Sequence, residues 1–269
     1  MFRFSSLLWG LLLFFCISPL FVVAYGKTVI IDPGHGGEDF GAKISYWIKG
    51  KKESRMKNVL EKDLTLSLSK KIYRKLQKKG YRVYLTRTHD RTVSLESRSN
   101  MAEKVGADLF ISIHANSSPN RSVGGIETFY LDNHKDKALK KVEQLENGAT
   151  GIHHHSPELD PVVIQILRDL VVSKTAPLSK KLATQIHQTL RQKVIRKYGL
   201  RNRGIRPGLF YVLALSRRPA VLLEIGFLSN PKERKIILSG RFQDDYADAV
   251  VKGITQWGEE KGRAKPPLF

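Results

Sequence analysis

The sequence predicts an α/β fold: a single domain with a mostly parallel, twisted sheet of about six strands, covered by helices on both faces. Short apolar runs alternate with segments in which apolar residues recur at helical spacing, the pattern of strands connected by helices. The chain has 269 residues, of which 41% are hydrophobic and 26% are charged, so it can bury one sizeable core. This composition excludes a disordered or collagen-like chain.

The expected strands are the apolar runs at residues 28–31, 81–86, 109–113, 126–131, 209–213 and 221–223. Two long helices are expected at residues 64–76 and 178–194, where leucine and isoleucine recur at helical spacing. Asn230 followed by proline predicts the start of a short helix, and a last helix is expected to end near Trp257. Residues 263–269 are expected to form a tail.

Residues 1–24 are expected to be a secretory signal peptide. Arg3 precedes a run rich in leucine and phenylalanine, and Val22 and Ala24 suit a signal-peptidase site. The alternative is an uncleaved anchor, because the run is only slightly shorter than a spanning helix. We therefore expect a periplasmic or secreted protein without stable membrane insertion after cleavage. Cys16, the one cysteine, lies in this run, so the domain at residues 25–262 offers no disulfide and no thiolate.

The chain carries a large positive charge, with 46 Lys+Arg against 25 Asp+Glu and a formal net charge of +21. Such a balance points to an anionic partner: nucleic acid, an acidic membrane face or a charged wall polymer. Nucleic acid would explain the charge but not the export signal, so we expect no nucleic-acid partner. A generally solvated basic surface is the alternative interpretation.

Three of the predicted strands end in residues that can bind a metal or move a proton. They run into His35, His114 and Glu224, and ligands of open α/β sheets bind at such strand ends. Two imidazoles and a carboxylate suit a zinc site with a fourth position open to water. Glu61, at the start of a predicted helix, could swing back toward them. Taken alone, each histidine could instead be an ordinary loop residue, and Glu61 could simply be a favourable charge at a helix N-terminus.

Four ordered motifs carry a resemblance to a known family. They are residues 29–42, which contain Asp-Pro-Gly-His-Gly-Gly, and residues 60–64, 112–116 and 223–230. Over about residues 27–258 the chain closely resembles the zinc-dependent N-acetylmuramoyl-L-alanine amidases (amidase type 3) of bacterial cell-wall turnover.

The resemblance implies a zinc ion (Zn2+) held by His35, Glu61 and His114, with Glu224 as the catalytic carboxylate. It also implies that Arg203 and Asn116 bind the substrate. The implied reaction cleaves the amide bond between N-acetylmuramic acid and L-alanine of peptidoglycan, in cell-wall remodelling or daughter-cell separation. A zinc deacetylase or carboxypeptidase acting on the same polymer is the alternative.

A second, serine-based peptidase activity is a weaker alternative. Ser67 and Lys70, residues 118–120 and residues 174–176 echo, in order, the short signatures of penicillin-binding enzymes. Such triplets recur by chance, and Ala176 stands where the last signature has glycine. Ser67 and Lys70 are also ordinary residues for a helix surface.

Residues 132–175 are too many for a simple crossover and are a candidate regulatory insertion. In some amidases of this family an inserted helix covers the zinc, and the glutamate of a Glu-Asn pair takes the open position. Glu146, followed by Asn147, resembles that pair, so we expect Glu146 to block the metal until a protein activator displaces the segment. A solvated surface helix followed by a histidine loop at residues 153–155 is the alternative.

Overall fold

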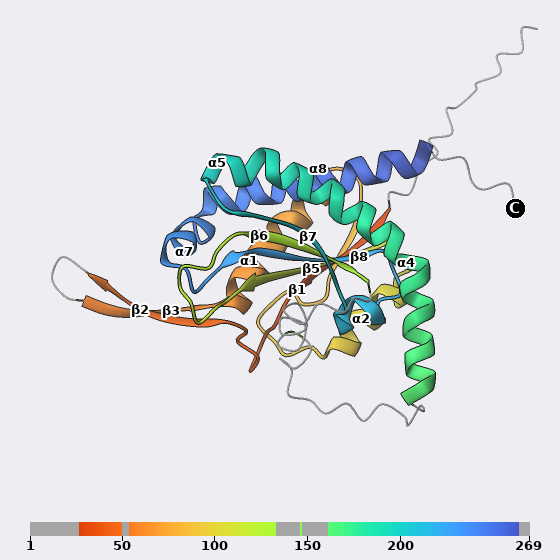
Figure 1. Ribbon diagram of the computed structural model, residues 1–269, viewed down its shortest axis with the longest axis horizontal. Helices are drawn as coiled ribbons and strands as arrows, with labels where there is room; N and C mark the ends of the chain where they lie inside the picture. The colour runs from red at the N-terminus through yellow and green to blue at the C-terminus, as the bar shows by residue number, and fades with distance from the viewer. Residues whose placement is uncertain (1–26, 50–53, 133–145, 147–160, 264–269) are drawn as a thin grey trace, which may run out of the picture.

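The computed structural model describes residues 27–49, 54–132, 146 and 161–263. Its centre is a six-stranded sheet in the order β4-β1-β5-β8-β6-β7 (Figure 1). The strands are β1 (Thr28–Pro33), β4 (Arg82–Leu85), β5 (Leu109–Asn116), β6 (Ile126–Leu131), β7 (Asn202–Gly208) and β8 (Ala220–Phe227). All neighbours are parallel except β6 and β8. The predicted α/β class with a mostly parallel sheet is confirmed.

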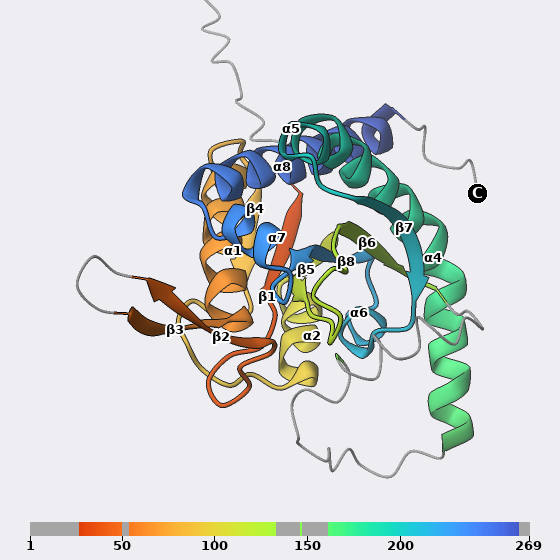
Figure 2. The same cartoon turned by 60° about the vertical axis from the view of Figure 1, so that its left-hand side comes forward.

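Helices cover both faces of this sheet (Figure 2). One face packs against α1 (Glu61–Gln77), α4 (Pro161–Leu190) and α8 (Gly240–Arg263). The other packs against α2 (Leu95–Lys104) and α6 (Tyr211–Leu215). Strands β1 and β8 are buried along their whole length, which explains why they are continuous apolar runs rather than alternating ones.

The long helices form where the apolar spacing predicts them. In α1 the side chains of Leu64, Leu68, Ile72 and Leu76 are all buried, and burying each contributes about 1.5–3 kcal/mol. The second long helix begins at Pro161, earlier than expected, and continues through a π-helical turn, η1 (Arg191–Ile195), into α5 (Arg196–Tyr198). The short helix α7 (Pro231–Ile237) begins as predicted, because the Asn230 side chain accepts the N–H groups of the first turn.

The predicted strand at residues 209–213 is wrong. Strand β7 lies earlier, at Asn202–Gly208, and the apolar run folds into helix α6, with Val212 and Leu213 buried. A short apolar run suits a buried helix as well as a buried strand, so its periodicity cannot decide. Strand β7 was not predicted, because its sequence contains Pro207, glycines and arginines, which are uncommon in strands. They are tolerated here because β7 is an edge strand.

A hairpin and a helix were also not predicted. Strands β2 (Lys43–Lys49) and β3 (Ser54–Leu60) form an antiparallel hairpin apart from the main sheet, in a stretch that is rich in lysine. Helix α2 begins at Ser94, whose hydroxyl accepts the N–H of Ser97.

Several expectations concern residues outside the described ranges. These are the signal peptide at residues 1–24, the histidines at residues 153–155 and most of the tail. Within the described ranges, none of the helices combines the length and the apolar character needed to cross a membrane.

Candidate metal centre and active site

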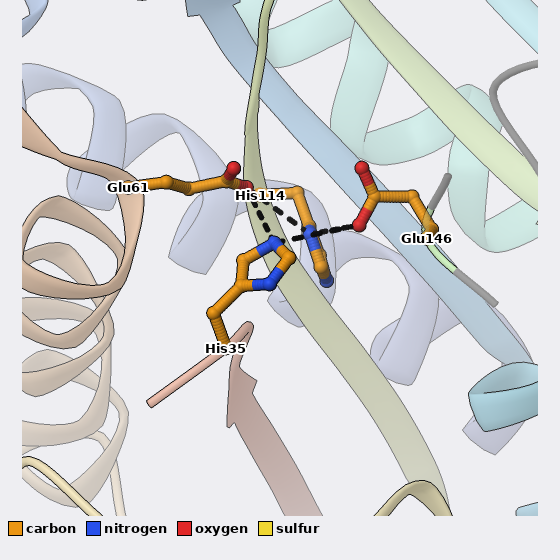
Figure 3. Close-up of side chains that lie close together, drawn as sticks. All are labelled: His35, Glu61, His114 and Glu146. Carbon is orange, nitrogen blue, oxygen red and sulfur yellow. Dashed lines mark ion pairs between the residues drawn. The ribbon is translucent and has the colours of Figure 1, made fainter. Parts of the chain in front are cut away.

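Strand order brings the predicted site residues together. Strands β1, β5 and β8 are parallel neighbours, so their carboxyl ends share one edge of the sheet. His35 follows β1, whereas His114 and Glu224 face each other in register on β5 and β8. His35 and His114 point toward a common centre at this edge (Figure 3), and Glu224 lies across from His114 on the neighbouring strand.

Glu61 joins the two histidines from the first position of α1. Its Oε1 atom lies 3.1 Å from Nε2 of His35 and 3.2 Å from Nδ1 of His114. The imidazole rings meet edge to face, with centroids 4.9 Å apart. Three side chains from three separate segments of the chain therefore point one atom each at a common centre.

Glu146 completes this group. Its Oε2 atom lies 2.9 Å from Nδ1 of His114 and 3.5 Å from Nε2 of His35. The four ligand atoms all lie within 4.8 Å of one another. Zinc bonds of about 2.0–2.2 Å in a tetrahedron place ligand atoms about 3.3 Å apart, close to the distances between each histidine and each glutamate.

The hydrogen bonds of these side chains leave the centre free for a cation. The inward atoms, Nε2 of His35, Nδ1 of His114 and Oε2 of Glu146, are buried and have no hydrogen-bond partner. The outward Nδ1 of His35 lies 2.9 Å from Oδ2 of Asp39. Glu61 accepts the backbone N–H groups of residues 42 and 115, each at 2.8 Å. Outer partners of this kind orient metal ligands, so the donor set fits zinc.

The pKa shifts of these residues also indicate that positive charge is favoured at this centre. Burial opposes a charged imidazole, yet the Glu61 carboxylate prevails and the pKa of His35 lies well above its usual value. Burial likewise opposes the charge of His114, but Glu146 and Glu61 raise its pKa to about 10. The pKa of Glu61 lies below its usual range, because the two histidines outweigh the effect of burial. A divalent cation would supply the same positive charge to neutral imidazoles.

Glu224 is a different kind of carboxyl group. It is fully buried, and neither of its oxygens has a hydrogen-bond partner among the described residues. Burial, and then the charge of Glu146, raises the pKa of Glu224 well above its usual range. A buried carboxyl group with a raised pKa is suited to act as a general acid and base.

Two buried arginines hold the loop that carries His35. Arg98 donates from Nη2 to the carbonyl oxygen of His35 at 2.7 Å, and from Nη1 to the carbonyl of Pro33 at 2.7 Å and to Asp32 at 2.8 Å. Arg87 donates to the carbonyls of residues 33 and 34. His35 needs this support, because its φ of 61° lies in the left-handed region that a non-glycine residue rarely adopts. No sequence pattern predicted a role for either arginine.

Two glycines are required by close approach of the ligands. A Cβ atom on Gly34 would lie 2.5 Å from the His114 ring, and one on Gly41 would lie 2.5 Å from the His35 ring. Any larger residue at these positions would displace a ligand.

The predicted substrate-binding residues surround a carboxylate that the sequence did not reveal. Glu127, 2% exposed, lies opposite Glu224 on β6. Asn116 donates to its Oε1 at 3.3 Å, and Nε of Arg203 lies 3.1 Å from its Oε2. Because β6 runs antiparallel to β8, the first residues of β6 lie at this edge, and only knowledge of strand direction would have found Glu127.

Ser67, the serine of the peptidase alternative, lies on a helix surface. Ser67 is on α1, and its hydroxyl donates to Gln243 of α8 at 2.9 Å. This is the ordinary helix-surface role.

Comparisons with known proteins agree with this geometry. The sequence matches the family described as N-acetylmuramoyl-L-alanine amidase over residues 29–256. N-acetylmuramoyl-L-alanine amidase AmiA of Escherichia coli (strain K12) is 31% identical over 234 residues, covering 86% of this chain and 76% of AmiA.

Solved structures of amidases share the fold. The N-acetylmuramoyl-L-alanine amidase of Clostridium difficile 630 is 31% identical with a TM-score of 0.62, covering 89% of this chain and 100% of that one. The CwlD amidase of Clostridioides difficile, solved in complex with the GerS lipoprotein, is 27% identical with a TM-score of 0.61, covering 87% and 100%.

Proposed function

The chain belongs to the N-acetylmuramoyl-L-alanine amidase family, and from this membership we propose how its side chains carry out the reaction. It is a hydrolase that cleaves the amide bond between N-acetylmuramic acid and L-alanine in peptidoglycan. The observation that supports a metal-assisted mechanism is the set of buried, unpartnered ligand atoms of His35, His114 and Glu146 around Glu61.

We assign His35, Glu61 and His114 as the ligands of one zinc ion. When bound, zinc lowers the pKa of water toward neutrality and polarises a carbonyl group. The chain fixes the ligands from outside: Asp39 beside His35, and backbone N–H groups on Glu61, hold these two side chains in place.

We assign Glu224 as the general base and acid. Its carboxylate would accept a proton from the attacking water and donate it to the amine that leaves as L-alanine of the stem peptide. The support for this assignment is that Glu224 lies directly across from His114 on the neighbouring strand. Its burial excludes bulk water from the proton transfer.

Arg203 and Asn116 are proposed to bind the substrate. Both side chains lie at the edge of the site next to Glu224, and both contact the Glu127 carboxylate. The Arg203 side chain is 22% exposed, and its guanidinium lies 5.3 Å from the centre of the Phe227 ring. Its N–H groups could therefore receive a carbonyl or carboxylate of the polymer while Glu127 and Phe227 hold the side chain still.

Glu146 is proposed to inhibit the enzyme. It occupies the fourth position around the centre, which a substrate carbonyl or water needs in a catalytic zinc site. Activation then requires a partner that favours the state in which Glu146 has left, which is a population shift. The relative CwlD was solved with a lipoprotein, GerS, which makes a protein activator a reasonable class of partner here.

Export by residues 1–24 is also proposed, to the periplasm or to the outside of the cell, where the substrate lies. The support is the apolar run after Arg3 and the small residue at Ala24.

Product analysis tests the activity. Digestion of purified peptidoglycan by the zinc-loaded protein should release stem peptides with free L-alanine amines and leave intact muramic acid, as measured by mass spectrometry. Free glucosamine amines would instead identify a deacetylase, and a shortened stem peptide a carboxypeptidase.

A further inference from the structure

An unusual number of apolar side chains is exposed on one side of the catalytic centre. Six large hydrophobic side chains are exposed among the described residues, and three of them, Phe40, Trp47 and Met56, lie on or next to the β2–β3 hairpin. Trp47 is 67% exposed and Met56 is 56% exposed. An exposed apolar cluster on an otherwise polar surface marks an interaction site more often than a single exposed residue does.

Trp47 and Met56 form a pair on the outer face of the hairpin. They are opposite each other in the antiparallel register, so their side chains share one face. The next pair on this face is Ser45 and Asn58, whose side chains are joined by a hydrogen bond of 2.7 Å. The outer face therefore has an apolar part and a polar part with a defined geometry.

The inner face holds the hairpin to the domain. Ile44 and Tyr46 pack against the main hydrophobic core, and Val59 belongs to it. The guanidinium of Arg234 lies 4.3 Å from the centre of the Tyr46 ring. Since a hairpin alone is marginally stable, these contacts are what keep Trp47 turned outward.

The hairpin is also strongly basic. Residues 43–60 contain six lysines and arginines and a single acidic residue. Lys43, Arg55 and Lys57 are exposed, and the structure assigns them no acidic partner among the described residues. Basic groups around an exposed aromatic side chain suit a partner that has both carboxylates and flat apolar surfaces.

The hairpin leads directly into the catalytic centre. Strand β3 ends at Leu60, and the next residue is the ligand Glu61. At about 3.3 Å per residue, Met56 lies about 16 Å along the strand from Glu61. Figures 1 and 2 show the hairpin extending away from the body of the domain. A long polymer whose bond is cut at the centre can therefore reach the hairpin with a neighbouring unit.

We propose that the outer face of the β2–β3 hairpin binds a unit of the peptidoglycan polymer beyond the one that is cleaved. This inference rests on the proposed function, because it takes its polymer from there. Trp47 and Met56 pack against the apolar C–H face of a sugar ring, and Lys43, which the register places on the same face, pairs with a stem-peptide carboxylate. Arg55 and Lys57 lie on the opposite face of the hairpin. An anionic membrane would also suit this chemistry, but the continuity of the hairpin with the centre favours the substrate itself. Two contacts on one strand raise the effective concentration of the scissile bond.

The test separates binding of the polymer from cleavage of the bond. The zinc-loaded protein is sedimented with insoluble peptidoglycan sacculi at 4 °C, and hydrolysis is measured on sacculi and on a soluble N-acetylmuramoyl-L-alanyl peptide that is too small to reach the hairpin. The variant is Trp47→Ala with Met56→Ala. Its control is Tyr84→Ala, which removes a 40% exposed aromatic side chain from edge strand β4.

The double variant should bind sacculi about tenfold more weakly and hydrolyse them correspondingly more slowly at low substrate concentration, as expected for loss of an aromatic anchor. Its activity on the small substrate should equal that of the unmodified protein, and Tyr84→Ala should change neither. Lys43→Ala should weaken binding and reduce its salt dependence, because Lys43 lies on the same face as Trp47. Lys79→Ala, an equal charge loss beyond the far end of α1, should not.

Unchanged sedimentation of the Trp47 and Met56 variant would overturn the inference. A second result would also overturn it: the variant no longer floats with anionic phospholipid vesicles but still binds sacculi normally. That result would assign the hairpin to binding a membrane. Failure of the unmodified protein to hydrolyse either substrate would overturn the proposed function instead, and sedimentation would still report on the hairpin.

Discussion

Replacing Arg98 by alanine should destabilise the protein by about 3–5 kcal/mol, because it leaves the buried Asp32 carboxylate without its cation. Both side chains are at most 2% exposed, and their ion pair is 2.8 Å long. Arg98 also donates to the carbonyls of Pro33, His35 and Val93. The same substitution removes these hydrogen bonds together with the ion pair, so their free energies are not added to the value given above. Urea unfolding followed by tryptophan fluorescence measures the change.

The pH dependence of the stability loss shows whether the lost partner of Asp32 causes it. Burial alone would raise the pKa of Asp32, but the charge of Arg98 and hydrogen bonds from Thr86, Arg98 and Ser112 outweigh it, so the pKa is lowered. A lowered pKa stabilises the fold above the ordinary pKa of aspartate and ceases to do so as the pH falls through the native value. Without Arg98, burial raises the pKa of Asp32, so the variant should recover relative stability as the pH falls from 7 toward 5 and the carboxyl group takes up a proton.

The same substitution should weaken zinc binding by about 10–100-fold, the usual effect of removing an outer partner of a ligand. Arg98 anchors the carbonyl of His35, whose backbone is in the left-handed region, and without it the loop can relax. Arg217→Ala is the control, since its ion pair with Glu103 is 3.9 Å long and exposed, and such pairs contribute about 0–1 kcal/mol. A loss of stability for Arg98→Ala as small as that for Arg217→Ala, or one independent of pH, would refute the reasoning.

The remaining predictions concern the centre and the N-terminus. His35→Ala or His114→Ala should lose both metal and activity, and full zinc occupancy by elemental analysis in either variant would argue against the ligand assignment. Glu224→Gln should keep zinc but lose most turnover, because an amide cannot accept the proton of water; unchanged cleavage would remove Glu224 from the mechanism. Glu146→Ala should raise basal activity several-fold on the same bond, and flat or reduced activity in a folded, zinc-loaded variant would exclude inhibition by Glu146. N-terminal sequencing of the exported protein should begin near Tyr25, whereas a retained Met1 would favour an anchor.

The sequence predicted the convergence of His35, His114 and Glu224 because strand ends are local features. An apolar run followed by a polar residue marks such an end, and parallel strands place their ends at one edge. The sequence also placed Glu61 at a helix start, from which its side chain could swing toward these strand ends, but its role as a zinc ligand depended on the family resemblance. Glu146 depended on the resemblance entirely, because a residue in a long connection has no local signal that fixes its position in space.

What escaped prediction depends on long-range pairing. The role of Glu127 follows from the antiparallel direction of β6, and the role of Arg98 from a contact with Asp32 across 66 residues of sequence. The β2–β3 hairpin was overlooked for another reason. Its lysines and arginines weaken the apolar alternation that marks a strand, and among the hairpin side chains whose burial is described, Ile44, Tyr46 and Val59 face the core.

Charge is distributed unevenly between the centre and the surface around it. The protein has a formal charge of +21, yet its centre gathers the carboxyl groups of Glu61, Glu127, Glu146 and Glu224. Each of the other three raises the pKa of Glu224, so the centre resists any further negative charge until a cation enters. A substrate that carries carboxylates would be repelled from such a centre and must be attracted elsewhere. We propose that basic residues outside the centre, on the hairpin and at Arg203, would provide that attraction, while the carboxyl groups of the interior would serve the metal and proton transfer.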